Sequence, residues 1–190
     1  LTSDKLFIAA NNYKGNHEIK LSVVRYGNVL GSRGSVIPFF IKQKEKGVLP
    51  ITDKRMTRFN ITLKEGVDFV LQCLGTMWGG ELFVPKIPSY RILDIAKAIA
   101  PDAKHKMVGI RPGEKLHEEM ITRTDALNSV EFENYYVILP STSLWDVEKF
   151  INEGGSSLGK KCETNFSYNS GSNKDFLSVD QLRKMIENHI

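Results

Sequence analysis

Cysteine is scarce in this 190-residue chain: Cys73 and Cys162 lie far apart, and neither belongs to a CxxC pair. The sequence therefore offers no disulfide framework and no cysteine spacing typical of a zinc site. None of the four histidines falls in an HExxH pattern, so no metal site is expected. Two unpaired thiols fit a reducing, cytoplasmic location.

Long apolar runs and clustered charge are missing as well. No stretch approaches the roughly 20 apolar residues that cross a membrane, and there is no signal peptide, so no membrane partner is expected. The 26 basic residues are scattered among 22 acidic ones, which leaves a net charge of +4 and no basic stripe. A nucleic-acid or scaffold role would rest on net charge alone, and we expect no nucleic-acid partner.

What is present is an ordinary globular composition, 41% hydrophobic and 25% charged, with strand and helix patterns in alternation. Strands are predicted in residues 21–26, 48–53, 55–62, 80–86, 104–110 and 135–140. Helices are predicted in residues 1–10, 35–46, 62–75, 89–100 and 177–190. This alternation predicts an α/β architecture, although the dinucleotide fingerprint GxGxxG is absent.

Local signals mark the ends of several helices. Ser89 is expected to cap the helix that Pro101 stops, and Ser178 with Gln181 forms a capping box for the last helix. Residues 152–175, rich in glycine, serine and asparagine, are predicted to be a long surface loop.

The stretch "GGSSLGKK" within that loop nearly spells a phosphate-binding loop. Lys161, however, occupies the place where a serine or threonine must reach the metal ion. No strong strand precedes the stretch either, so we interpret it as a mobile loop.

A more informative loop is "RYGNVLGSRG", which follows a buried-looking strand at its carboxyl end, where open α/β sheets bind ligands. Its glycines let the backbone approach a ligand closely, and Asn28 offers both a donor and an acceptor. A tight turn that simply needs glycine explains the same pattern, and the loop alone does not decide between the two.

The stretch "GIRPGEKLHEEM" holds Arg111 and Glu114 around a rigid Pro-Gly corner. Arg58 projects from the apolar segment "MTRFNIT", and two guanidinium groups on one anion are a common way to bind a diphosphate. An ionised Glu114, which only accepts hydrogen bonds, suits the hydroxyls of a ribose. The alternatives are a solvated arginine on a strand and a surface turn with a local Arg-Glu ion pair.

Several long motifs resemble one family closely: "LTSDKLF", "VVRYGNVLGSRGSVIPFF", "ITDKRMTRFNIT", "ELFVPKIPS" and "GIRPGEKLHEEMI". They are similar to the C-terminal half of the inverting UDP-N-acetylglucosamine 4,6-dehydratases, which belong to the extended short-chain dehydrogenase/reductases. The resemblance covers the whole chain and is weakest from residue 141 to 176. It implies a cytoplasmic lyase that uses NADP, acts on a UDP-sugar and forms a homo-oligomer.

The resemblance also implies roles for single residues. Val29 would contact the nicotinamide end of NADP, and Asn28 the nucleotide sugar. Arg58 and Arg111 would bind the diphosphate and Glu114 the uridine ribose, with Arg33 and Val36 as further substrate contacts. One departure is Asn60, where the family commonly carries tryptophan after "TRF".

By the same resemblance, the fold would be the C-terminal part of a Rossmann-like α/β fold with a small substrate-binding lobe. Residues 1–50 would end the Rossmann-like sheet, residues 51–140 would form the nucleotide-sugar-binding lobe, and residues 141–190 a loop-rich tail with the last helix. The catalytic Tyr-x-x-x-Lys pair and the NADP loop would lie upstream of Leu1, so no catalytic residue is expected in this chain.

Two other functions stay open on the sequence alone. A free-standing module could bind a nucleotide sugar without reacting. A related nucleotide-sugar epimerase would share the arginine-and-carboxylate clamp, and the acid and base groups that separate it from a dehydratase are not in this chain.

Overall fold

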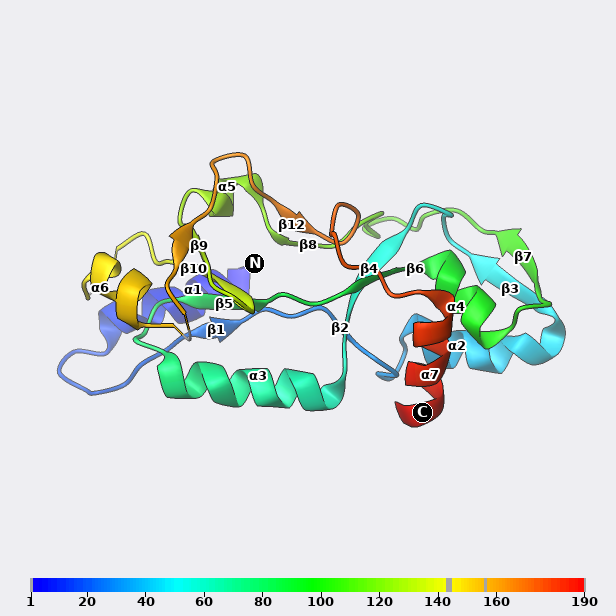
Figure 1. Ribbon diagram of the computed structural model, residues 1–190, viewed down its shortest axis with the longest axis horizontal. Coiled ribbons are helices and arrows are strands. Elements are labelled where there is room, and N and C mark those ends of the chain that lie inside the picture. Colours follow the sequence, from blue (N-terminus) through cyan, green and yellow to red (C-terminus); the bar gives the residue numbers. More distant parts are fainter. Residues whose placement is uncertain (1, 143–144, 156, 190) are drawn as a thin grey trace. The chain divides into compact units, whose positions relative to one another are not determined.

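The computed structural model describes residues 2–142, 145–155 and 157–189 (Figure 1). Two compact units make up the chain, each assembled from three separate stretches. The first unit comprises Leu1–Tyr26, Glu65–Lys86 and Met120–Ser167, and the second comprises Gly27–Lys64, Ile87–Glu119 and Tyr168–Ile190. These units follow contacts in space, and the division into three consecutive parts made from the sequence stays a prediction.

The first unit is built on a five-stranded sheet in the order β1-β5-β10-β9-β11. Its strands are β1 (Val23–Val24), β5 (Leu82–Pro85), β9 (Ser129–Glu131), β10 (Tyr135–Ile138) and β11 (Lys160–Lys161). β1 and β5 run parallel, and the other neighbouring pairs are antiparallel. All four residues of β5 are buried, as is typical of a strand covered on both faces.

Within its described residues, the first unit wholly or mainly contains four helices: α1 (Thr2–Ala10), α3 (Leu63–Thr76), α5 (Arg123–Ala126) and α6 (Val147–Glu153). A 3₁₀ turn, Asn11–Tyr13, follows α1. α3 packs Phe69 and Cys73 into the same apolar core as Phe83 of β5 and Tyr135 of β10. Burial of these side chains is the main force that holds the unit together.

The second unit contains two small sheets, one in the order β2-β4-β6 and one that pairs β3 with β7. Their strands are β2 (Asn28–Val29), β3 (Val48–Ile51), β4 (Thr57–Ile61), β6 (Ser89–Arg91) and β7 (Lys104–Met107). β4 runs parallel to β2 and antiparallel to β6, while β3 and β7 are parallel. Two further short strands are β8 (Glu119–Ile121) and β12 (Tyr168–Asn169).

Three helices cover the second unit's core: α2 (Val36–Gln43), α4 (Ile92–Ile99) and α7 (Val179–His189). A 3₁₀ turn, Lys44–Lys46, ends α2. Figure 1 shows the three helices grouped beside β3 and β7, and their shared core includes Phe40, Leu49, Ile95 and Leu182. Strands and helices thus alternate as the sequence predicted, and the α/β class is confirmed.

The predicted helix cap at Ser89 was wrong. Ser89 is buried in β6, where its backbone N–H donates to the carbonyl of Asp175 at 2.9 Å. The helix begins only at Ile92, with Arg91 as its N-cap residue. The carbonyl of Ser89 in turn accepts from the N–H of Leu177 at 2.8 Å, so contacts with a distant segment hold the backbone of Ser89 extended and override the local signal.

The capping box at the last helix is confirmed. The backbone N–H of Ser178 donates to Gln181 Oε1 at 2.8 Å, and the N–H of Gln181 donates to Ser178 Oγ at 3.3 Å. Two backbone donors at the helix start are thereby satisfied, which fixes where α7 begins.

The long loop predicted for residues 152–175 contains two short strands, β11 and β12, and a buried Tyr168, so the prediction was only partly right. Lys160 and Lys161 form β11 and pair with β9. A phosphate-binding loop needs a helix at that point, so the stretch does not have its geometry.

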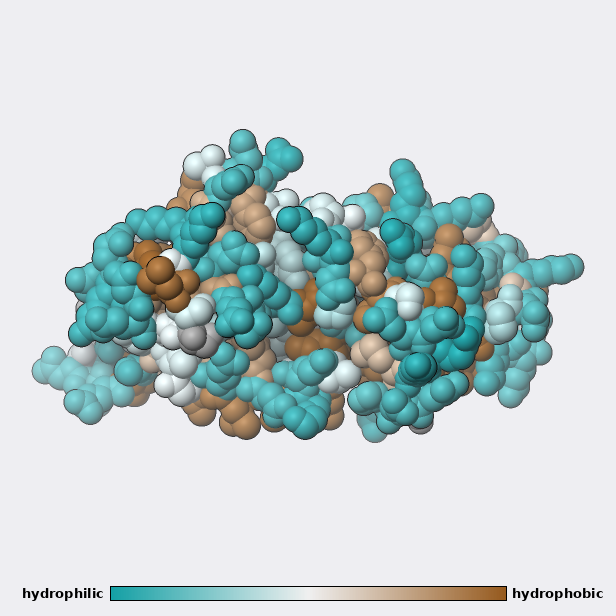
Figure 2. All heavy atoms as spheres, in the orientation of Figure 1, coloured by the Kyte–Doolittle hydropathy of each residue, from teal (hydrophilic) through white to brown (hydrophobic). Residues whose placement is uncertain are grey.

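α3 is apolar on two faces. Besides the buried face, it exposes a second row at helical spacing, consisting of Leu63, Val67, Val70, Leu71 and Leu74. On the face drawn in Figure 2, hydrophobic atoms gather along the lower edge, where Figure 1 draws α3. In the part of the chain that the structure describes, no helix has the length and apolar character needed to cross a membrane.

Candidate functional site

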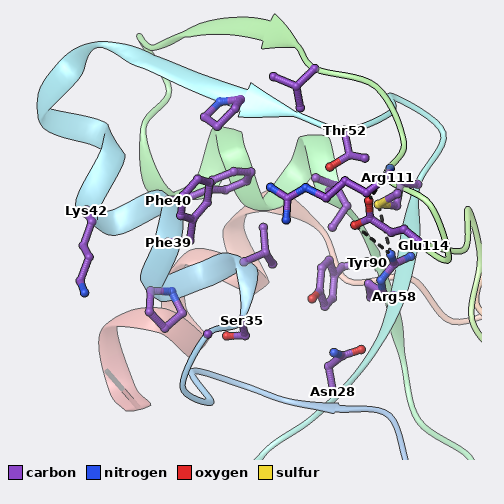
Figure 3. Close-up of a pocket in the computed structure, with 17 residues that line it drawn as sticks. Asn28, Ser35, Phe39, Phe40, Lys42, Thr52, Arg58, Tyr90, Arg111 and Glu114 are labelled. Atoms are coloured by element: carbon purple, nitrogen blue, oxygen red, sulfur yellow. Dashed lines mark hydrogen bonds and ion pairs between the residues drawn. The ribbon is translucent and has the colours of Figure 1, made fainter.

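The second unit contains a cavity of about 490 Å³, within the range of small-molecule sites. One side is apolar and includes Phe39, Phe40 and Pro50. The polar groups on its wall come from β2, α2, β4, β6 and the loops that follow β3 and β7: Asn28, Ser35, Lys42, Thr52, Arg58, Tyr90, Arg111 and Glu114 (Figure 3). The structure therefore brings together residues that are widely separated in the sequence.

The Pro-Gly corner has the fixed geometry that its sequence predicted. Gly113 adopts a φ of +80°, which favours glycine. The backbone N–H of Arg111 donates to Glu114 Oε2 at 3.2 Å, and the N–H of Glu114 donates to the Arg111 carbonyl at 3.0 Å. No ion pair joins the two side chains in the described structure, and the Arg111 guanidinium has no described partner. The corner therefore presents a free cation to the cavity.

Arg58 lies in the same wall but is held tightly by the protein. Its Nη1 donates to the carbonyls of Thr57 at 2.7 Å and Leu116 at 3.2 Å. Its Nε lies 3.7 Å from Glu118, and its Nη2 lies 4.0 Å from Glu114. Only 13% of the Arg58 side chain is exposed. Arg58 thus supplies a fixed positive charge with few free donors, whereas Arg111 can direct its whole guanidinium at a ligand.

Asn28 lies on β2, in register with Asn60 of β4. The glycine before it is required by packing, because a Cβ on Gly27 would lie 2.4 Å from the Cβ of Phe59. Further along the loop, Gly34 adopts a φ of +77°. The loop therefore needs glycine for packing, and it also places Asn28 at a cavity.

The remaining predicted contacts fall in different places. Val36 lines the cavity, but neither Val29 nor Arg33 is among the residues that line it. Val29 pairs with Ile61 in the β2-β4 ladder, and Arg33 is exposed. The roles that the resemblance gave to Val29 and Arg33 stay predictions.

The sequence did not predict the polar lining residues Ser35, Lys42, Thr52 and Tyr90, nor Glu118, which lies close to the cavity wall. Ser35 precedes α2 and lines the cavity, and its Oγ is buried without a hydrogen-bond partner among the described residues. Glu118 lies behind Arg58 and accepts a hydrogen bond from the backbone N–H of Phe59 at 3.1 Å. Burial raises the pKa of Glu118, although the Phe59 N–H and Arg58 act in the opposite direction. A glycine-serine pair before an apolar helix was the available signal for Ser35.

Asn60, the position at which the chain departs from the family pattern, is buried, and its Nδ2 has no partner among the described residues. Its backbone N–H donates to the Pro88 carbonyl at 2.9 Å. Tyr90, which lines the cavity, is also buried, and burial raises the pKa of its phenol.

The first unit has a cavity of its own, about 510 Å³, beside α1. Its arginine, Arg25, is already engaged: Nη2 lies 2.7 Å from Asp4, Nη1 lies 3.6 Å from Asp125, and Nη1 also donates to a backbone carbonyl. Two carboxylates neutralise Arg25, which leaves the exposed Lys5 as the other cation at this cavity. The cavity of the second unit has two arginines, Arg58 and Arg111, on its wall and is the better candidate for an anionic ligand.

Comparison with known families gives the class of protein to which this α/β chain belongs. The polysaccharide biosynthesis protein family matches residues 1–140, and the chain belongs to this family.

Individual relatives make the assignment more specific. The chain is 53% identical over 193 residues to UDP-N-acetylglucosamine 4,6-dehydratase (inverting) from Campylobacter jejuni, a match that covers 100% of this chain and 57% of the relative. UDP-glucose 4-epimerase from Rickettsia conorii is 35% identical over 96% of this chain and 54% of its own length. The chain is therefore a homologue of part of a UDP-N-acetylglucosamine 4,6-dehydratase, as the sequence motifs predicted, and spans about half the length of these relatives.

A solved structure agrees with the fold. The X-ray structure of Pen from Bacillus thuringiensis aligns with 98% of this chain and 56% of its own chain, at a TM-score of 0.81 and 30% identity. The α/β fold of this chain is therefore also found as part of a longer protein.

Proposed function

We propose that this chain supplies the nucleotide-sugar-binding part of an inverting UDP-N-acetylglucosamine 4,6-dehydratase. The observation that carries the proposal is the corner of Arg111 and Glu114, which holds a free guanidinium and a carboxylate at the wall of one cavity. The 53% identity to a dehydratase of that name supports the choice of substrate.

The cavity offers a chemically suitable partner for each part of such a ligand. The Arg111 guanidinium can donate two parallel hydrogen bonds to a diphosphate, and the fixed charge of Arg58 adds to the attraction. Glu114 can accept hydrogen bonds from ribose hydroxyls. Asn28 faces the same cavity and would contact the glycosyl group. The apolar side around Phe39 and Pro50 suits a flat base.

In the proposed reaction, UDP-N-acetylglucosamine becomes a UDP-4-keto-6-deoxy-hexosamine with inversion at C5. NADP would supply the hydride acceptor and donor, and Val29 would contact its nicotinamide end. The other named residues act by binding: they hold the diphosphate and ribose so that the hexose is oriented for reaction. Such remote contacts can lower a barrier by several kcal/mol through positioning alone.

Isothermal titration calorimetry of the chain tests this proposal. UDP-N-acetylglucosamine and UDP should each bind with a stoichiometry of one, whereas free N-acetylglucosamine should not bind measurably. A folded chain that binds neither nucleotide would refute the proposal. Binding of nucleotide without any turnover by the protein that carries this chain, supplied with NADP, would support a non-catalytic module instead.

A UDP-glucose 4-epimerase is the second candidate, because such an enzyme is 35% identical over nearly the whole chain. The products separate the two reactions: a dehydratase releases water and yields a 4-keto sugar, and an epimerase yields an isomer of unchanged mass. Mass spectrometry of the sugar nucleotide after incubation decides between them.

We further infer a cytoplasmic homo-oligomer. Cys73 and Cys162 are both free thiols, as suits a reducing compartment. The exposed apolar row of α3 is the kind of surface that a second copy covers. Sedimentation velocity at several concentrations should show association, and Leu71→Glu together with Leu74→Glu should abolish it. A wild-type chain that sediments as a monomer throughout would contradict the inference.

A further inference from the structure

Glu118 occupies a central place behind the cavity wall that the binding scheme does not use. Its carboxylate accepts the backbone N–H of Phe59 at 3.1 Å, and one oxygen lies 3.7 Å from Arg58 Nε. Glu118 therefore contacts β4 directly and faces the residues that form the wall. A partly buried carboxylate needs such donors, because burial without them is costly.

The same carboxylate fixes the side chain of Asn28. One terminal atom of the Asn28 amide lies 2.6 and 2.9 Å from the two oxygens of Glu118, and with Nδ2 assigned to that position both contacts are hydrogen bonds that Nδ2 donates. We assign this orientation because, in the opposite one, the amide oxygen would face two carboxylate oxygens that only accept hydrogen bonds when Glu118 is ionised. In this assignment Oδ1 takes the place at which Figure 3 draws the amide nitrogen of Asn28, a side chain that lines the cavity.

We propose that Glu118 is a positioning residue that makes Asn28 a hydrogen-bond acceptor, so that the ligand group placed there must be a donor. This inference rests on the proposed function and deepens it, since it assigns Asn28 to a hydroxyl or amide N–H of the glycosyl group and not to a phosphate oxygen. The protein then donates hydrogen bonds at one end of the ligand and accepts them at the other: Arg111 donates to the diphosphate, and Asn28 accepts from the sugar.

The substitution Glu118→Gln isolates this effect because it keeps the shape of the side chain. The single oxygen of glutamine is needed by the Phe59 N–H, so its amide nitrogen must face Asn28. Asn28 then turns its own oxygen toward Gln and presents Nδ2 to the ligand. The donor group of the glycosyl moiety then faces a second donor, so the hydrogen bond between Asn28 and the sugar is lost.

Glu118→Gln also removes a negative charge near Arg58. Comparing two ligands that share the diphosphate cancels the effect of that charge on binding. A freed Arg58 acts on the diphosphate, which UDP and UDP-N-acetylglucosamine share. The ratio of their affinities therefore reports on the sugar end alone. Glu119→Gln serves as the matched control, because Glu119 is the next residue, is exposed and undergoes the same chemical change.

The experiment is a double-mutant cycle with Asn28→Ala, measured by calorimetry on the chain with both nucleotides. Each single variant should lower the UDP-N-acetylglucosamine to UDP affinity ratio by about fivefold, the effect of one hydrogen bond. The double variant should show no larger change than Asn28→Ala, and the control should match wild type. Equal losses for both nucleotides in Glu118→Gln, or changes in the ratio that multiply in the double variant, would overturn the inference.

A second readout needs no ligand. In the ¹H–¹⁵N spectrum of wild type, the chemical shifts of the Asn28 side-chain NH₂ signals should differ from those of a solvent-exposed asparagine. They should return to the values of an exposed asparagine in Glu118→Gln and stay unchanged in Glu119→Gln. An unshifted pair in wild type would refute the role of Glu118. If wild type binds neither nucleotide, the proposed function fails, and this spectrum still decides whether Glu118 positions Asn28.

Discussion

The substitution Arg111→Ala tests the anion-binding role of the corner most sharply, because it removes a guanidinium that has no described partner. Nothing buried loses a hydrogen bond, so the fold should keep its stability. The loss should appear in UDP affinity instead. A hydrogen bond to a charged group contributes roughly 1.5–3 kcal/mol, so we expect the Kd for UDP to rise roughly 10- to 100-fold.

Calorimetry at low and high salt measures this effect, with urea unfolding as the check on stability. The difference between wild type and variant should narrow at high salt, because Arg111 is exposed to screening. Arg123→Ala is the matched control: it removes the same charge from an exposed position in the first unit. An unchanged Kd in Arg111→Ala, or an equal rise in the control, would refute the reasoning.

Three further predictions concern stability and titration. Gly27→Ala should lower the free energy of unfolding by about 1–3 kcal/mol, because its Cβ has no room. Gly75→Ala, with open space around its Cβ, should raise it by roughly 0.5–1 kcal/mol, and urea unfolding that ranks the two the other way contradicts the packing. Burial raises the pKa of Cys73 to about 12 and of Cys162 to about 11. Both thiols should therefore react slowly with iodoacetamide at neutral pH until urea unfolds the chain. Fast labelling of the folded chain would contradict this prediction. Burial also raises the pKa of Glu118, so the folded state binds its proton more tightly than the unfolded chain does. The unfolding free energy of wild type relative to Glu118→Gln should therefore rise as the pH falls through the raised pKa toward 4.5. A difference that does not change with pH would refute this prediction.

The parts of the site that are local in the chain could be predicted from the sequence. Arg111 and Glu114 are close in sequence, and the Pro-Gly corner between them sets their geometry through backbone preferences alone. The helix start at Ser178 and Gln181 was predictable for the same reason, since a capping box involves only neighbouring residues.

The parts that depend on strand pairing could not be predicted. The contact between Glu118 and Asn28 exists only because β2 pairs with β4 and Phe59 of β4 holds the carboxylate. Likewise, Ser89 carries a cap signal, but pairing of β6 with β4 puts it in a strand. Sequence spacing does not give the register of such pairs, because distant residues meet only after the chain folds.

The sequence also could not predict that the two arginines differ in their hydrogen-bond partners. Arg58 and Arg111 look alike in the sequence, yet the carbonyls of Thr57 and Leu116 occupy the first and leave the second free. Which donors remain for a ligand depends on the partners that the fold supplies, and only coordinates give that count.

The most direct test of the central claim is a ¹⁵N amide titration of the chain with UDP. The account predicts that the signals that shift come from the cavity of the second unit, in particular Gly34, Val36 and Glu114, while Gly79 and Gly80 at the cavity of the first unit stay in place. Shifts centred on Gly79 and Gly80, or none at saturating UDP, would contradict the assignment of the nucleotide site to Arg111 and its neighbours.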